Sequence, residues 1–223
     1  MCFSTGASFG AGAVLTIIGV ASARKVHDRS QIPLALFQFI FAGQQLAEGF
    51  VWLSLNNSEN LGWQDISIYS FLTVSHIIWP VWIPFSILLL EKDLKRRKML
   101  KFLLAAGIVL ALYHFYCLVY LTVNARIHGH HIQYLIEHPV PLLLAANILY
   151  GLSTIFSSLI SSSCRMWWLG LFILFSYIAA YLINRENVIS VWCFFATSLS
   201  VIVYLILRGF PKALKRTKIQ ISS

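Results

Sequence analysis

Residues 34–55 read LALFQFIFAGQQLAEGFVWLSL, an apolar run that contains one carboxylate, Glu48, and two carboxamides, Gln44 and Gln45. About 20 mainly apolar residues are enough to cross a hydrocarbon core as an α-helix. A lone charge inside such a helix is costly and normally faces a partner or a wet cavity. The stretch therefore predicts a membrane-spanning helix that forms one wall of a polar site.

The composition predicts that this helix is one of several. Hydrophobic residues make up 58% of the 223 residues, charged residues only 11%, and the mean hydropathy is +0.75. This balance is far from that of a soluble domain. Apolar windows of spanning length predict an all-α, polytopic membrane protein with a single domain over residues 1–223 and seven transmembrane helices, at 5–23, 34–55, 66–90, 100–123, 139–161, 166–184 and 188–208.

The basic residues predict how these helices are oriented. Lys and Arg are retained on the cytoplasmic side of short membrane loops. With the N-terminus outside and the C-terminus in the cytoplasm, all 17 Lys and Arg residues except Arg126 and Arg185 fall on the cytoplasmic side. Because topology accounts for the net charge of +9, we expect membrane lipids as partners and no nucleic acid.

Polar residues at matching depths predict a site in the outer half of the bundle. Glu48, His76 and His114 lie on the second, third and fourth predicted helices, and Tyr150 and Tyr177 continue the layer on the fifth and sixth. In lipid, such side chains face one another or a wet cavity. The inner halves are dominated by Leu, Ile, Val and Phe apart from a few serines. We therefore expect a chamber that opens outward and is closed toward the cytoplasm.

A glutamate and two histidines are the protein ligands of many catalytic zinc sites, which keep a fourth position for water. The metal lowers the pKa of that water and polarises a carbonyl group. Cys117 lies three residues after His114 on the same helix and is a substitute ligand. The expected metal ligands are thus Glu48, His76, His114 and Cys117, and the expected catalytic residues are Glu48, Gln45 to orient the water, and Tyr150 and Tyr177 to stabilise an oxyanion.

Two further segments offer ligands on the outer side. The loop NARIHGHHIQYLIEHP, residues 124–139, is rich in histidine and can capture a metal ion or close over the site as a lid. Within it we favour His131, because Ile132 and Tyr134 can anchor it at the interface. If the initiator methionine is removed, the amine and thiol of Cys2 form a second candidate metal ligand.

Two motifs carry a resemblance. The opening M-C-F-S-x-x-A-S-F and the motif Q-x-x-E-G-x-x-W, formed here by Gln45, Glu48, Gly49 and Trp52, are similar to those of a family of bacterial multi-pass integral membrane proteins with no assigned function. The resemblance extends over most of the chain. It implies a bacterial inner (cytoplasmic) membrane location, and it implies no activity or catalytic residue.

Three classes of function remain open. The first is a membrane metalloenzyme, with zinc as its cofactor, that acts on a lipid-like or amphipathic substrate at the Glu48, His76 and His114 site. The second is a haem b protein for electron transfer or sensing, with His76 and His114 as axial ligands. The third is a non-catalytic transporter or receptor for a metal or small molecule.

Overall fold

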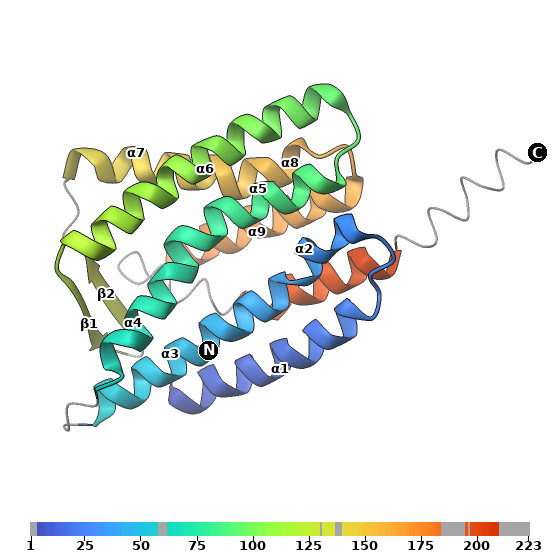
Figure 1. Ribbon diagram of the computed structural model, residues 1–223. Coiled ribbons are helices and arrows are strands. Elements are labelled where there is room, and N and C mark those ends of the chain that lie inside the picture. The colour runs from blue at the N-terminus through green and yellow to red at the C-terminus, as the bar shows by residue number, and fades with distance from the viewer. Residues whose placement is uncertain are drawn as a thin grey trace, which may run out of the picture.

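The computed structural model describes residues 4–57, 62–129, 131–136, 140–183, 195 and 197–209. Long helices packed side by side form the molecule (Figure 1). The elements are α1 (Thr5–Ala23), η1 (Arg29–Gln31), α2 (Ile32–Ala35), α3 (Phe37–Asn56), α4 (Gln64–Leu72), η2 (Thr73–Ile78), α5 (Trp79–Leu90), α6 (Leu94–Tyr120), β1 (Val123–His128), β2 (His131–Ile136), α7 (Val140–Gly151), η3 (Leu152–Phe156), α8 (Ser157–Ile160) and α9 (Cys164–Ile183), followed by the helix Thr197–Gly209.

The described helices confirm a multi-pass membrane protein. Six are long and apolar enough to cross a membrane, and they correspond to the first six predicted spans: Thr5–Ala23, Arg29–Asn56, Gln64–Leu90, Leu94–Tyr120, Leu142–Ile160 and Cys164–Leu182. Of the seventh predicted span, 188–208, the structure describes the helix Thr197–Gly209, and residues 188–194 and 196 lie outside the described residues. The count of seven and the outside location of the N-terminus stay predictions.

The sequence of α1 lets it pack closely along α3. Ser4 caps the helix, because its hydroxyl accepts a hydrogen bond from the backbone N–H of Ala7 at 3.3 Å. A Cβ atom on Gly12 would lie 3.0 Å from the Leu46 side chain, and one on Gly19 would lie 3.0 Å from the ring of Phe39. Small residues at such contacts allow membrane helices to approach one another.

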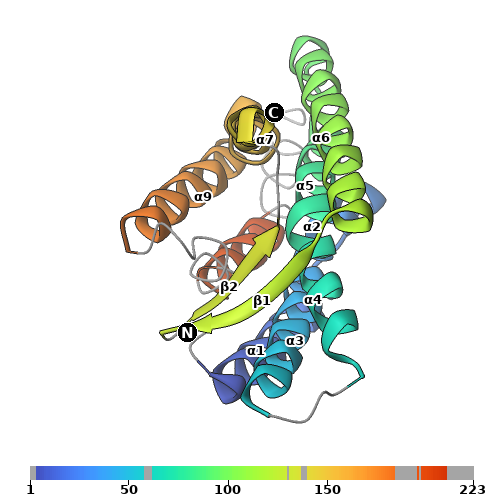
Figure 2. The ribbon, with the colours of Figure 1, turned by 90° about the vertical axis from the view of Figure 1, so that its left-hand side faces the viewer.

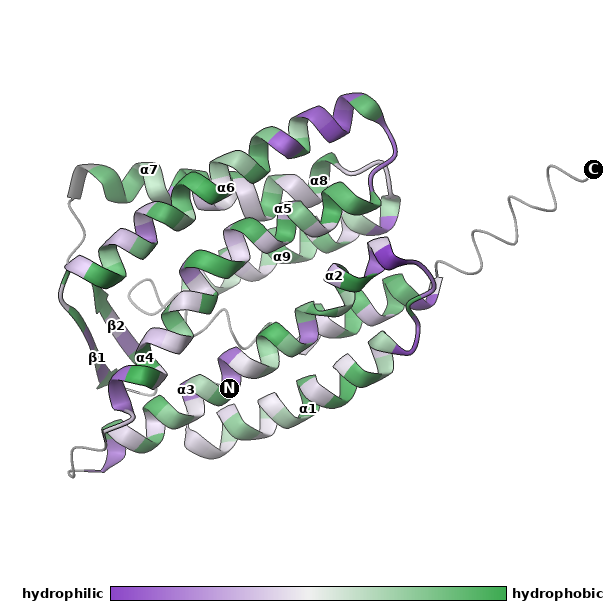
Figure 3. Ribbon diagram, in the orientation of Figure 1, coloured by the Kyte–Doolittle hydropathy of each residue, from purple (hydrophilic) through white to green (hydrophobic). Residues whose placement is uncertain are grey.

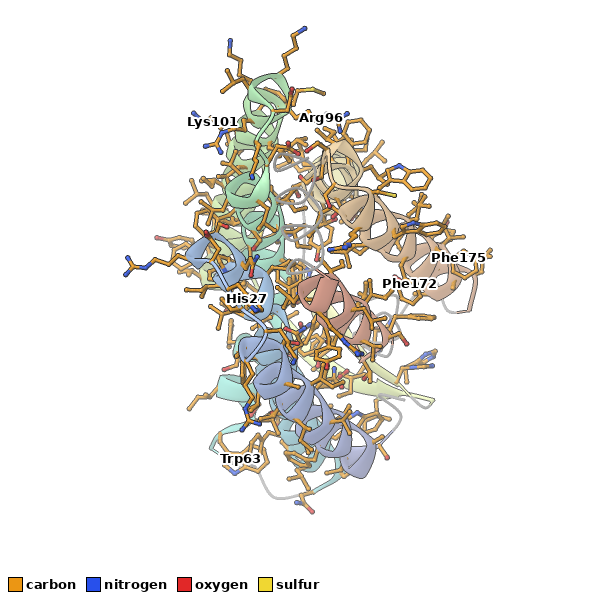
Figure 4. All side chains as sticks on the ribbon, turned by 90° about the vertical axis from the view of Figure 1, so that its right-hand side faces the viewer. His27, Trp63, Arg96, Lys101, Phe172 and Phe175 are labelled. Carbon is orange, nitrogen blue, oxygen red and sulfur yellow. The ribbon has the colours of Figure 1, made fainter. Side chains whose placement is uncertain are left out.

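Most of the charged stretch between the third and fourth predicted spans is helical. α6 begins at Leu94, six residues before the predicted span, and the Asp93 carboxylate caps it by accepting from the backbone N–H of Arg96 at 2.8 Å. Figure 3 shows hydrophilic residues gathered at this start of α6 and at the neighbouring α1–α2 connection. We call this the basic end. Figure 4 looks onto it, with Arg96 and Lys101 on α6 and His27 on the α1–α2 connection.

The histidine-rich loop forms a β-hairpin, which the sequence did not predict. β1 and β2 pair antiparallel from Val123 opposite Ile136 to His128 opposite His131, and Gly129 in the turn has φ +64°. Figure 2 looks onto this hairpin end and shows the two strands crossing in front of the helices. β1, VNARIH, alternates strictly between apolar and polar residues, a strand signal that the sequence analysis did not use, whereas β2, HIQYLI, loses the alternation after Gln133.

Two π-helical segments interrupt the third and fifth spans. η2 lies between α4 and α5, and η3 lies between α7 and α8. In a π-helix the backbone N–H bonds to the carbonyl five residues earlier, which adds one residue to the turn and re-aims the side chains. Such segments occur often at functional sites. Here η2 carries His76, one of the two histidines predicted as metal ligands.

Two apolar clusters form the interior. The larger one lies toward the basic end and joins α2, α3, α5, α6, α9 and the helix Thr197–Gly209. The smaller one lies toward the hairpin end and consists of Val51, Trp52, Ile68, Phe71, Leu72, Leu118 and Ile132. The predicted polar residues on α3, η2 and α6 lie between these clusters. This arrangement positions the candidate site.

Candidate functional site

A hydrogen bond between α3 and α5 sets the register of the site. The indole Nε1–H of Trp79 donates to Gln44 Oε1 at 2.9 Å, and both side chains are buried. α3 runs toward the hairpin end, whereas the α4–η2–α5 span runs away from it (Figure 1). One turn from this bond toward the hairpin end therefore brings Glu48 on α3 and His76 on η2 to the same level.

The glutamate of the site is fully buried and has an amide beside it. Glu48 is 0% exposed, and its Oε2 accepts a hydrogen bond from Gln45 Nε2 at 3.3 Å. The two residues are three apart, so they share one face of α3. Hydrogen bonding of this kind is what allows a carboxyl group to lie inside a membrane bundle.

The two predicted histidines meet. The ring centroids of His76 and His114 lie 4.9 Å apart, with an angle of 64° between the ring planes. His114 is buried on α6, and His76 is half-buried on η2. Their helices touch at Gly107, where a Cβ atom would lie 2.0 Å from the carbonyl oxygen of Pro80. A glycine at this contact therefore helps to hold the His76–His114 pair together.

Both rings make a hydrogen bond through Nδ1. Ser75 Oγ lies 2.8 Å from Nδ1 of His76 and 3.2 Å from the Leu72 carbonyl oxygen, so it accepts from Nδ1 when its own hydrogen is directed to that carbonyl. Nδ1 of His114 lies 3.2 Å from the carbonyl oxygen of Leu110, which can only accept. Nδ1 of His114 therefore carries hydrogen, and Nδ1 of His76 carries it when Ser75 accepts; in neutral rings of this tautomer Nε2 carries the lone pair. Histidines that bind metals commonly have this arrangement.

Pro80 and Tyr150 together explain the backbone of η2. The N–H of Trp79 bonds to the Val74 carbonyl, five residues earlier. The next residue is Pro80, which has no N–H and therefore cannot donate to the Ser75 carbonyl. The hydroxyl of Tyr150, on α7, donates to that carbonyl at 2.9 Å. Tyr150 thus supports the segment that carries His76, in addition to its predicted place in the polar layer.

Tyr150→Phe is expected to destabilise the protein by about 1–2 kcal/mol, because it leaves the buried Ser75 carbonyl without this donor. Thermal unfolding in mild detergent measures the change. Tyr116→Phe is the matched control, since Tyr116 is exposed on α6. Equal melting temperatures for the Tyr150 and Tyr116 variants would contradict the role given to the Tyr150 hydroxyl.

The other predicted ligands are not brought to the His76–His114 pair as a set. Within the described ranges, no three His, Cys, Asp or Glu side chains form a group that could hold a metal ion. Cys117 is buried one turn beyond His114, His131 lies on β2 opposite His128, and Tyr177 is half-buried on α9. Cys2 lies outside the described residues. The expected centre with Glu48, His76 and His114 as three joint ligands is thus not assembled in this structure.

The hairpin covers the polar layer, which the sequence predicted to open outward. Ile132 on β2 is 1% exposed within the smaller apolar cluster, and the ring of Tyr134 stacks on Phe71 with centroids 4.6 Å apart. Val51 and Trp52 of this cluster lie about one turn beyond Glu48 on α3. The two predicted anchors of the loop, Ile132 and Tyr134, therefore dock the hairpin on α4 as a cover.

Sequence reasoning missed Ser75 and Trp79, which the structure places in the hydrogen bonding of the site. Ser75 directly precedes His76, and Trp79 lies three residues after it. A polar residue next to a membrane histidine and a proline one turn later together indicate a disturbed helix. That signal was present in SHIIWP, residues 75–80.

The fold and this site define the chain as a helical multi-pass membrane protein in which two histidines, one buried and one half-buried, contact each other. Comparison with family-wide sequence patterns matches residues 1–218 to a family of unknown function (DUF6629). The chain belongs to that family. No curated protein and no solved structure matches it significantly.

Proposed function

We propose that this protein binds a transition-metal ion, zinc above all, through Nε2 of His76 and Nε2 of His114. The observation that supports the proposal is the contact of two imidazole rings whose Nδ1 atoms are both occupied by hydrogen bonds, to Ser75 and to Leu110. With hydrogen on both Nδ1 atoms, the lone pairs are on Nε2, the nitrogen through which such rings bind a metal. Two protein ligands leave the remaining positions of a tetrahedral ion for water or substrate.

The neighbourhood of the His76–His114 pair favours hydrolysis of a lipid-like or amphipathic substrate. A zinc ion bound there would supply a water of lowered pKa. Glu48 lies at the level of His76, by the register that Trp79 and Gln44 set, and is suited to accept a proton from such a water. Gln45 holds the Glu48 carboxylate in place. The apolar cluster under the hairpin excludes bulk water and offers a surface for an acyl chain.

Haem b does not fit the same pair. Two histidines that ligate one haem iron lie on opposite faces of the porphyrin, which separates their rings. The rings of His76 and His114 contact each other at 4.9 Å between centroids, so no porphyrin can lie between them in this geometry. We therefore assign haem no role in the proposal.

The distribution of charge supports a bacterial inner-membrane location with the basic end in the cytoplasm. Figure 3 shows the hydrophilic start of α6 at the end of the bundle opposite the hairpin. By the positive-inside tendency, the hairpin then lies on the outer side, and so does the N-terminus of α1. The proposed substrate would come from the outer leaflet.

Metal analysis of the purified protein tests the proposal. Wild-type protein in mild detergent is expected to retain about one zinc ion per chain, and His76→Ala and His114→Ala are each expected to weaken binding by more than about tenfold. His128→Ala is the matched control, because His128 is exposed on β1. Glu48→Gln is expected to keep the metal and to abolish hydrolysis of a test ester such as p-nitrophenyl laurate.

Three other results of the metal and hydrolysis assays would overturn or change the proposal. Folded wild-type protein without metal, also after incubation with zinc, would overturn the proposal. Metal that the His76 and His114 variants retain but the His128 variant loses would move the site to the hairpin. Binding at the pair without hydrolysis of any ester would refute the enzymatic part and leave a metal transporter or receptor.

A further inference from the structure

An open groove runs along the outward face of the third span, toward the hairpin end. Its volume is about 590 Å³, which is within the range of small-molecule sites. Five described residues line it: Asp65, Ile66, Tyr69, Ser70 and Thr73. Their helical spacing places them on one face of α4 and on the first residue of η2. We call this the α4 groove, and its inner end, Thr73, lies three residues before His76.

The face of the third span that forms the α4 groove is polar, although it is turned away from the protein core. Asp65, Tyr69 and Ser70 are exposed on it. On α6, by contrast, the residues exposed toward the same end include Leu112, Phe115 and Val119, as expected for contact with lipid tails (Figure 1). Polar side chains on an outward face of a membrane helix are expected only where they meet water, lipid headgroups or a partner.

The length of the third span places the α4 groove at the level of the lipid headgroups. Gln64–Leu90 has 27 residues, or about 40 Å at 1.5 Å per residue, whereas a hydrocarbon core is about 30 Å thick. Leu90 directly precedes the charged residues of the basic end, so the excess length falls at the hairpin end. About 20 residues counted back from Leu90 reach Phe71. Asp65 and Ser70 therefore lie in the headgroup layer.

The chemistry of the α4 groove suits an ammonium group. Asp65 alone is charged among the five described residues that line it. The ring of Tyr69, 38% exposed, lies one turn further along the same face. A carboxylate binds an ammonium group by a charge-assisted hydrogen bond, and an aromatic face binds it by a cation–π contact. The hydroxyls of Ser70 and Thr73 are suited to donate to phosphate or ester oxygens.

We propose that the α4 groove binds a phospholipid whose headgroup carries a primary ammonium group, that is, a phosphatidylethanolamine. The ammonium group donates to Asp65 and contacts the Tyr69 ring, and the glycerol esters then lie near Thr73. The Asp65 carboxylate disfavours lipids whose headgroup carries only negative charge. Binding in the groove needs no metal. The role of this lipid as the substrate of the His76–His114 pair rests on the proposed function.

General solvation is the competing explanation for the polar face. Side chains at the headgroup level can meet water and headgroups of every kind without selecting one. Specificity is a difference between affinities for two ligands. The two explanations therefore differ in whether a change at Asp65 affects one class of lipid or none.

Native mass spectrometry of the full chain in mild detergent tests the proposal, because it resolves each bound lipid. The protein is first treated with a chelator, so that the result does not depend on the proposed metal site. Dilauroyl phosphatidylethanolamine and dilauroyl phosphatidylglycerol are titrated separately. Asp65→Asn is expected to weaken the tightest ethanolamine-lipid site by about tenfold or more and to leave binding of the glycerol lipid unchanged. Tyr69→Leu is expected to weaken the same site by about two- to fivefold.

Two variants serve as controls. Asp65→Glu keeps the carboxylate and is expected to keep the ethanolamine-lipid site. Tyr116→Leu changes an exposed tyrosine on α6, outside the α4 groove, and is expected to leave the binding of both lipids unchanged.

Three results would overturn the proposal. One is wild-type protein without a saturable ethanolamine-lipid site. The second is folded Asp65→Asn protein that binds this lipid as tightly as wild type does. The third is an equal loss of both lipids in that variant, which would establish general solvation. Selective binding by wild-type protein that holds no zinc would support the lipid site and refute the proposed function alone.

Discussion

Replacing Gly107 with alanine is expected to destabilise the protein by about 3 kcal/mol or more. A Cβ atom there would lie 2.0 Å from the carbonyl oxygen of Pro80, and a backbone carbonyl cannot rotate away as a flexible side chain can. α5 and α6 would have to separate, and His76, on η2 directly before α5, would move away from His114 on α6. Thermal or urea unfolding in a fixed detergent measures the loss.

Gly43→Ala is the control for the effect of alanine in a membrane helix. Gly43 lies on an exposed face of α3, and a Cβ atom on it would meet nothing within 4 Å. Because alanine is the better helix former, this variant is expected to be neutral or stabilised by up to roughly 1 kcal/mol. If both variants unfold at the wild-type temperature, the close contact of α5 and α6 is not a determinant of stability.

The second large effect is expected at Glu91, which ties two connections together at the basic end. Its carboxylate accepts hydrogen bonds from the backbone N–H groups of Lys92 and Asp93, from the backbone N–H of Ser162, and from the hydroxyls of Ser161 and Ser162. Arg96 joins the same connections, since its guanidinium donates to the Ile160 carbonyl at 2.8 Å. The α5–α6 and α8–α9 connections are thereby fixed to each other.

These contacts hold Glu91 ionised. Burial by itself raises the pKa of the Glu91 carboxyl. The hydrogen bonds from Ser162, Asp93 and Lys92 together lower the pKa by more than burial raises it, so it falls from the usual 4.5 to about 2. A lowered pKa means that Glu91 contributes its full stabilisation above about pH 4.5. The contribution is lost as the pH falls from there to about 2.

Glu91→Gln is expected to lower stability by about 2 kcal/mol at pH 7, because the donors from the α8–α9 connection lose a charged acceptor. The difference from wild type should shrink steadily as the pH falls from about 4.5 toward 2, where the wild-type carboxylate takes up a proton. Unfolding curves of both proteins across this range measure it. A constant difference at every pH would refute the assignment of the acid-sensitive stability to Glu91.

The sequence predicts the spans and part of the site for a clear physical reason. Long apolar windows identify the helices, since a bilayer imposes a minimum length on them. Polar residues inside those windows are rare enough to be informative, and the structure confirms that His76 and His114 meet. A buried position for Glu48 follows from the same reasoning.

What the sequence could not predict depends on backbone detail and on contacts between distant segments. The π-helical turn at His76 arises from Pro80 and a hydroxyl on another span, and periodicity does not show either. The hairpin is short, and Ile132 and Tyr134 reveal its role only when they are seen against α4. Glu91 sits within a charged run that resembles an ordinary topogenic loop, and its partners lie about 70 residues later.

The link between Tyr150 and the Ser75 carbonyl also bears on the order of assembly. In the lipid phase, a carbonyl that its own helix does not satisfy is a defect until another span supplies a donor. The ribosome makes the third span before the fifth, and the donor, Tyr150, is on the fifth. The geometry around His76 is therefore completed only after the fifth span docks, so a truncated chain that ends before residue 140 should insert correctly yet hold its central histidine in a different backbone conformation.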